Sequence, residues 1–127
     1  MSARDMAVIG HLVLQDGLHD GKRILSEAYI REMTAPQLKL GERFGYMNYG
    51  YLRYQPYDDK AVCAAIGDCG NIIYVNREKQ VSVGVTGTFK PRIFDRVSFI
   101  EQKVLPVLEE EQDPLRGKWH ESVFFRK

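Results

Sequence analysis

Apolar positions near the N-terminus follow a helical period. Met6, Ile9 and Val13 lie three and four residues apart, so their side chains fall on one face of a helix. Ser2 precedes this stretch and is a typical N-cap, with an acidic residue three positions later as in a capping box. The pattern therefore predicts an amphipathic helix over about residues 3–15.

Two further stretches have helical signals. Ser26 is a second N-cap, and it predicts a helix over Glu27–Thr34 that ends before Pro36, because the residue before a proline disfavours the helical region. Pro91 suits the first turn of a third helix of about 17 residues. The apolar stripe of that helix indicates a core-facing side. It consists of Ile93, Val97, Ile100, Val104 and Leu108.

The middle of the chain has the patterns of strands. The aromatic-rich stretch Phe44–Tyr54 and the apolar runs Ala61–Ile66 and Asn71–Val75 are each predicted as strands. After a turn at residues 76–79, Gln80–Thr86 is predicted as the return strand of a hairpin. One face of that strand carries valines, and the other carries small side chains that would let another element pack closely. The small residues are Ser82, Gly84 and Thr86.

The order of these elements predicts an α+β fold. It consists of an antiparallel β-sheet of three or four strands with the C-terminal helix packed on one face. The two N-terminal helices then need another surface to cover. Such a sheet has two open edges, which proteins usually cover or pair. A chain of 127 residues fits a single domain.

Charge and hydropathy narrow the possible functions. Eighteen Lys and Arg against seventeen Asp and Glu leave a net charge of +1, which argues against binding nucleic acid through bulk charge. No run approaches the roughly 18 apolar residues of a membrane span. Residues 1–10 do not have the pattern of a signal peptide, so a cytoplasmic location is the default expectation.

Few residues suggest chemistry by themselves. The sequence has no GxSxG, glycine-rich phosphate loop or HExxH, and its three histidines are far apart, so neither a metal site nor a cofactor is expected. Cys63 and Cys69 do not form a CxxC motif, and free thiols are the favoured interpretation over a disulfide. The many tyrosines between residues 46 and 57 are interpreted as cross-strand pairs rather than as a stacking platform.

Several segments, taken in order, resemble the serine β-lactamase-like hydrolases, a family of class C β-lactamases, penicillin-binding DD-peptidases and related esterases. These segments are Ser2–Ala7, Gly21–Glu27, Glu32–Thr34, Phe44–Leu52, Ala65–Asn76 and Glu78–Gly87. The resemblance identifies residues 1–108 as the C-terminal portion of such a domain and leaves 109–127 as a tail of unknown role. It implies part of a β-lactamase/transpeptidase-like fold, whose active site lies between an antiparallel sheet and an all-helical region.

The chain departs from this family at the catalytic motif. The family uses a serine nucleophile with a lysine three residues later, and the lysine helps to remove the proton of the serine. None of the five serines of this chain has a lysine at that spacing. The resemblance therefore implies a β-lactamase-like serine hydrolase portion with no catalytic residue of its own, and inactive alone.

The third motif of the family does have a counterpart in this chain. In the family this motif lines the substrate pocket, so the resemblance predicts that the corresponding residues line a pocket here. They are Gly67, Asp68, Cys69, Gly70 and Asn71. Asp68 stands where the family commonly has a basic or aromatic residue, and an acid there would repel a substrate carboxylate. Tyr46 and Tyr49 are expected in a nearby wall.

The same resemblance suggests a partner. The family pairs N-terminal strands against its final hairpin, so Gln80–Thr86 would be an exposed edge that self-associates or binds a complementary N-terminal fragment. Two alternatives stay open. The chain could be a standalone small α+β binding or interaction module, or an enzyme with Cys69 as its nucleophile, although no histidine is near that cysteine in sequence.

Overall fold

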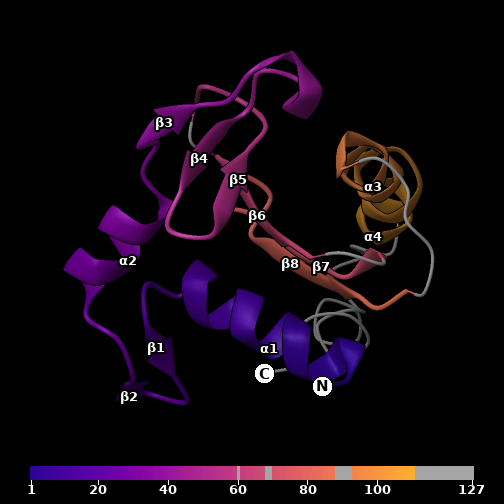
Figure 1. Cartoon of the computed structure of the whole chain (residues 1–127). Coiled ribbons are helices and arrows are strands. Elements are labelled where there is room, and N and C mark those ends of the chain that lie inside the picture. The colour runs from indigo at the N-terminus through magenta and orange to yellow at the C-terminus, as the bar shows by residue number, and fades with distance from the viewer. Residues whose placement is uncertain (60, 68–69, 88–92, 111–127) are drawn as a thin grey trace.

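The structure, a computed structural model, describes residues 1–59, 61–67, 70–87 and 93–110. Its elements begin with two N-terminal helices, continue through strands and end in helix (Figure 1). In chain order they are α1 (Ala3–Leu14), β1 (Leu18–His19), β2 (Lys22–Arg23), α2 (Glu27–Thr34), β3 (Leu38–Lys39), the 3₁₀ turn η1 (Glu42–Phe44), β4 (Asn48–Gly50), β5 (Arg53–Gln55), β6 (Val62–Ile66), β7 (Ile72–Asn76), β8 (Val81–Val85), α3 (Ile93–Phe99), the π-helical turn η3 (Ile100–Val104) and α4 (Leu105–Glu110).

The strands confirm an antiparallel sheet in an α+β fold. Six strands pair in the order β3-β4-β5-β6-β7-β8, while β1 and β2 form a separate short hairpin. The centre of the sheet is regular, with Tyr74 opposite Ala64 on one side and opposite Val83 on the other. The described sheet is therefore larger than the three or four strands that the sequence predicts.

One additional strand comes from the aromatic-rich stretch, and the other is β3, which precedes that stretch. The prediction of one continuous strand over Phe44–Tyr54 is wrong, because the chain there forms the end of η1 and then the hairpin β4–β5. Gly45, Tyr46 and Leu52 have φ angles of 62°, 56° and 55°, which are left-handed and incompatible with a strand. Aromatic content predicted the extended segments correctly but not the turns between them.

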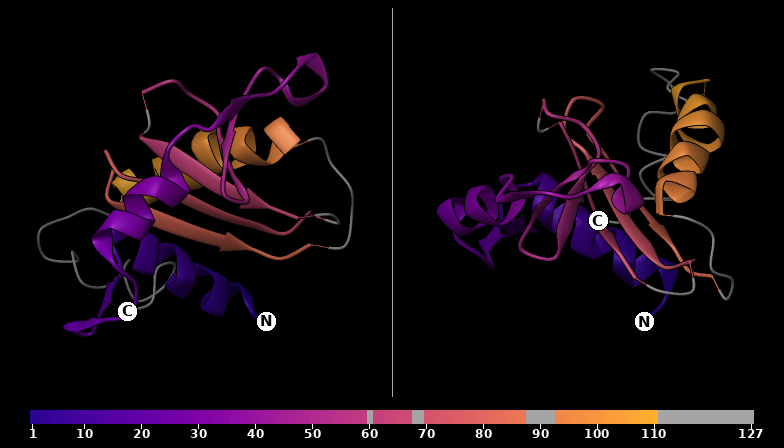
Figure 2. Two further views of the ribbon diagram at one scale, coloured as in Figure 1. Left: turned by 60° about the vertical axis from the view of Figure 1, so that its left-hand side comes forward. Right: turned by 45° about the horizontal axis from the view of Figure 1, so that its top comes forward.

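The C-terminal helical segment covers one face of the sheet, as predicted (Figure 2). Val97, Ile100 and Leu108 of the predicted stripe are buried in this core. The helix is not uniform, since η3 interrupts it between α3 and α4. Residues 88–92, with Pro91, lie outside the described residues, as does 111–127 of the predicted tail.

No helix in the described ranges combines the length and apolar character needed to cross a membrane.

Helix α1 packs on the opposite face of the sheet, so the fold has three layers rather than two (Figure 2). The face of β8 that carries small side chains permits this contact, as predicted. A Cβ atom added to Gly84 would lie 2.3 Å from the carbonyl oxygen of Ala3, and the hydroxyl of Ser82 donates a hydrogen bond of 3.0 Å to the carbonyl of Ala7. This second core also includes α2, with Ile30 fully buried.

Local capping fixes where the first two helices begin. The Asp5 N–H donates to the Ser2 hydroxyl at 3.1 Å, and the Ser2 N–H donates to the Asp5 carboxylate at 2.8 Å, which is the predicted capping box. These bonds to Ser2 hold the pKa of Asp5 below its usual value. The Ser26 hydroxyl accepts from the Tyr29 N–H at 3.1 Å and caps α2 in the same way.

Candidate functional site

The residues of the predicted third motif follow β6 and precede β7. The Gly67 N–H donates a hydrogen bond of 3.0 Å to the carbonyl of Asn71, which closes the turn between the two strands. Gly70 is buried and has a φ of 97°, a conformation that favours glycine. Asp68 and Cys69 lie outside the described residues. The structure therefore brings Gly67 and Asn71 together and fixes the ends of this turn.

Two other elements hold the same turn. Arg96 of α3 is buried, and its Nη1 donates a hydrogen bond of 2.6 Å to the carbonyl of Gly67. The side-chain oxygen of Asn71 accepts a bond of 3.3 Å from the N–H of Gly87, just beyond β8. Bonds from a charged donor are stronger than neutral ones, so Arg96 is a firm link between the C-terminal helix and the turn.

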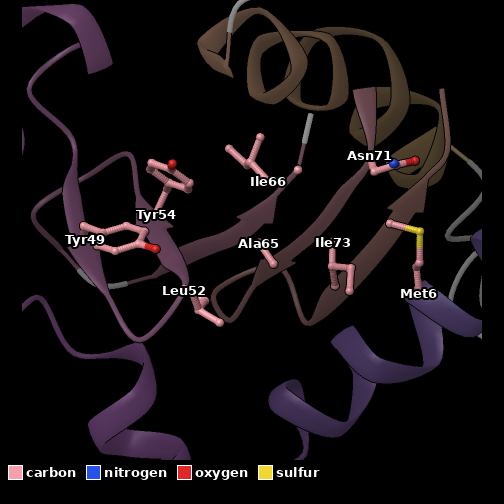
Figure 3. Close-up of a pocket in the computed structure, with 9 residues that line it drawn as sticks. Met6, Tyr49, Leu52, Tyr54, Ala65, Ile66, Asn71 and Ile73 are labelled. Carbon is pink, nitrogen blue, oxygen red and sulfur yellow. The ribbon is translucent and has the colours of Figure 1, made fainter. Parts of the chain in front are cut away.

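A pocket of about 290 Å³ opens beside this turn (Figure 3). Within the described residues β5 pairs with β6 at one position, Tyr54 opposite Ala64, so the β4–β5 hairpin diverges from the end of β6 and leaves a space. Residues from α1, both hairpin strands, β6 and β7 surround the space. They are Met6, Tyr49, Leu52, Tyr54, Ala65, Ile66, Gly67, Asn71 and Ile73.

Aromatic rings make one wall of the pocket. Tyr49 and Tyr54 are directly opposite each other on β4 and β5, with ring centroids 4.9 Å apart and planes at 58°. Phe44 also stacks on Tyr54, with ring centroids 6.4 Å apart. These rings form the cross-strand pair that the sequence favours over a nucleic-acid platform. Tyr49 lies in the pocket wall, whereas Tyr46 is 58% exposed and does not line the pocket.

The pocket also contains residues that sequence reasoning missed. Met6 enters it from α1, a helix interpreted only as a core element, and Leu52 enters from the β4–β5 turn. Arg96 of α3 does not line the pocket, but it donates a hydrogen bond to the lining residue Gly67. None of these belongs to a recognised motif, because their proximity arises from the pairing of distant elements. Leu52 was predicted within one continuous strand, so no signal in the sequence indicated its place at a turn beside the pocket.

A separate polar cluster lies under the C-terminal helix. Glu101 of η3 accepts hydrogen bonds from the hydroxyls of Tyr57 and Tyr74, the latter at 3.0 Å. Bonding to this carboxylate raises the pKa of Tyr57 to about 12, and burial raises the pKa of Tyr74. The Asn76 amide donates to the Tyr74 hydroxyl at 3.1 Å. This network attaches the helix to the sheet at the border of a second cavity, of about 350 Å³.

The other reactive groups that the structure describes include one cysteine. Cys63 is a free thiol, as expected, and burial raises its pKa although Arg53 and Arg77 oppose the shift. A buried thiol of raised pKa is a poor nucleophile. Within the described ranges, no group of three His, Cys, Asp or Glu side chains is placed to hold a metal ion.

Comparison with known proteins supports the fold. The chain is similar to the solved structure titled "Putative 6-aminohexanoate-dimer hydrolase from Bacillus anthracis", with a TM-score of 0.65 and 24% sequence identity. The similarity covers 87% of this chain but 30% of that one, so the chain spans less than a third of that protein's length. No known family profile and no curated protein matches the sequence. The chain thus has an α+β fold that is consistent with part of a β-lactamase-like fold.

Proposed function

We propose that the chain is the C-terminal, sheet-bearing portion of a β-lactamase-like serine hydrolase. In this proposal a polypeptide portion outside the present sequence supplies the serine and lysine. The serine oxygen attacks an ester or amide carbonyl, its proton passes through the lysine to the leaving group, and water then releases the acyl group. The chain alone forms no acyl-enzyme, and residues 109–127 form a tail outside the hydrolase portion.

The observation that carries this proposal is the pocket beside the third-motif turn. Gly67 and Asn71 both line it, at the end of β6, in a fold similar to part of a hydrolase. Three hydrogen bonds tie the described ends of the turn to each other, to α3 and to the end of β8. A rigid turn suits a site that must present backbone groups to a substrate. We assign Asp68 and Cys69 to the same pocket lining, whereas Gly70 is buried in the turn and is not among the described lining residues.

The edge of the sheet supports the choice of partner. Strand β8 is the last strand in the pairing order, and no described strand lies beyond it. A strand with an unpaired edge is a template for pairing with a further polypeptide segment. The proposed partner is therefore an N-terminal portion that pairs with β8, or failing that a second copy of this chain.

Hydrogen exchange with the N-terminal portion of a β-lactamase-like hydrolase tests the pairing. We expect the outward-facing amides of β8 to exchange quickly in the isolated chain and at least tenfold more slowly in the mixture. The amides between β6 and β7 serve as the internal control, because they are already paired. Hydrolysis of a short p-nitrophenyl ester should appear in the mixture and in neither portion alone.

Two results would reject the proposal. A chain that stays monomeric at high concentration in light scattering, and shows no added protection with the N-terminal portion, has no need of a strand partner. If such a monomer binds small molecules at the pocket, the standalone binding module is the better description. Ester hydrolysis by the isolated chain would reject the proposal that the catalytic serine and lysine come from a separate portion.

A further inference from the structure

Leu52 has an unusual conformation for its residue type. It occupies the two-residue turn between β4 and β5, where Gly50 pairs with Arg53, and its φ of 55° is left-handed. Bulky residues avoid this region, in which glycine and asparagine are common. Leu52 is also 78% exposed, so neither burial nor backbone preference explains a leucine at this turn. Strain of this kind points to a role outside stability.

The position of Leu52 suggests that role. Its side chain lies at the border of the 290 Å³ pocket, near Ala65 and Ile73 (Figure 3). Met6 and Ile66 add further apolar surface, and the tyrosine pair completes the wall. Among the described residues that line the pocket, none is an Asp, Glu, Lys or Arg. The described lining therefore offers apolar contact, and the charged residue that we assign to the pocket, Asp68, is an acid that would repel a carboxylate.

We propose that this pocket takes an uncharged, apolar group of the substrate, such as an aliphatic or aromatic acyl group, and that Leu52 is a specificity-determining contact for it. The proposal rests on the proposed function and names the substrate class for that site. Transfer of an apolar group from water to such a lining is favourable, whereas a carboxylate would lose its hydration without a cationic partner in the described lining. Carboxylate-bearing substrates should therefore be disfavoured at this position.

A matched set of small ligands tests the inference on the isolated chain. Pentanamide and pentanoate have the same alkyl chain and differ in charge. In ¹H–¹⁵N titrations, we expect pentanamide to shift the amide signals of Leu52, Ala65 and Ile73 in a saturable manner. Pentanoate should bind at least roughly fivefold more weakly, because the described lining does not compensate a buried negative charge.

Two variants separate recognition from stability. Leu52→Asn and Tyr46→Asn each place a residue tolerant of left-handed backbone at an exposed position with a φ of 55° or 56°. We expect neither to lower the melting temperature. Leu52→Asn should weaken pentanamide binding roughly fivefold through lost apolar contact, whereas Tyr46→Asn, outside the pocket lining, should leave it unchanged.

The outcomes distinguish this inference from the function on which it rests. Stronger binding of a charged ligand, unchanged affinity in Leu52→Asn, or no saturable shift at the pocket would each overturn the inference. Ester hydrolysis by the mixture with an N-terminal portion would still support the proposed function in those cases. Conversely, selective pentanamide binding without any reconstituted hydrolysis would retain the apolar pocket and reject the hydrolase proposal.

Discussion

Arg96 and Gly67 are 29 residues apart in the chain, yet the guanidinium of Arg96 donates a hydrogen bond of 2.6 Å to the Gly67 carbonyl. This bond joins the C-terminal helix to the turn beside the pocket. Because Gly67 also donates to Asn71, both its backbone polar groups are engaged. The geometry of the candidate site thus depends on a helix that contributes no residue to the pocket wall.

Replacement of Arg96 should weaken this link measurably. Arg96→Met removes a charged donor and leaves a partly buried carbonyl without it, so we expect a loss of about 2 kcal/mol in the free energy of unfolding. Arg96→Lys keeps a charged donor and should lose less. Urea denaturation measures both, with Lys103→Ala at an exposed position of the same helical segment as the control. Equal free energies of unfolding for Arg96→Met and Lys103→Ala would mean that the Arg96–Gly67 hydrogen bond contributes nothing to stability.

A methyl group at Gly84 should disrupt the contact between α1 and β8. The new Cβ atom would lie 2.3 Å from the Ala3 carbonyl oxygen and 2.7 Å from the Ala7 nitrogen, and these are backbone atoms that cannot rotate away. We expect Gly84→Ala to cost about 2 kcal/mol or more in thermal or urea unfolding. Gly41→Ala is the control, since nothing lies within 4 Å of its added methyl, and it should change stability by less than about 0.5 kcal/mol.

Alkaline pH should destabilise the protein through the tyrosines bonded to Glu101. The pKa of Tyr57 is about 12 in the folded state against an ordinary value of 10.0, so between these values the folded state retains a proton that the unfolded state loses. The contribution of Tyr57 to the free energy of unfolding is therefore fully present below about pH 10 and is lost as the pH rises toward 12. Unfolding free energies measured at intervals over that range would show the decline.

Variants identify which hydroxyl causes that decline. Tyr57→Phe should flatten it in part, and the raised pKa of Tyr74 should account for much of the remainder. Tyr46→Phe alters an exposed tyrosine for which no bond to Glu101 is expected, and it should retain the full decline. A Tyr57→Phe protein that loses stability with pH as steeply as the unmodified protein would contradict the role of the Tyr57–Glu101 bond.

Local signals in the sequence were sufficient for the regular elements. The Ser2 cap and the period of three and four predicted α1 within a residue of its end, and the alternation of valines with small residues predicted both faces of β8. The mistakes occurred where backbone conformation departed from residue preference. Tyr46 and Leu52 have left-handed φ angles that their residue types disfavour, so the β4–β5 hairpin could not be predicted from propensity.

The candidate site was predictable only in part, for a related reason. The resemblance indicated Gly67 and Asn71, and the structure places both at one pocket. Asp68 and Cys69 lie outside the described residues, so their assignment stays a prediction. Met6, Leu52 and the support from Arg96 depend on strand order and on how helices pack against both faces of the sheet. Periodicity reports which side of an element is apolar but not which element it meets.

Intact mass after treatment with a fluorophosphonate tests the central claim most directly, namely that this is a hydrolase portion without its own nucleophile. Two samples are needed, the chain alone and the chain mixed with an N-terminal portion. Each sample is treated with the fluorophosphonate and, in a separate reaction, with a penicillin. We expect the mass of this chain to stay unchanged in every case, with a fluorophosphonate adduct only on the N-terminal portion of the mixture. A stoichiometric adduct on a serine, or on Cys69, of the isolated chain would contradict the account.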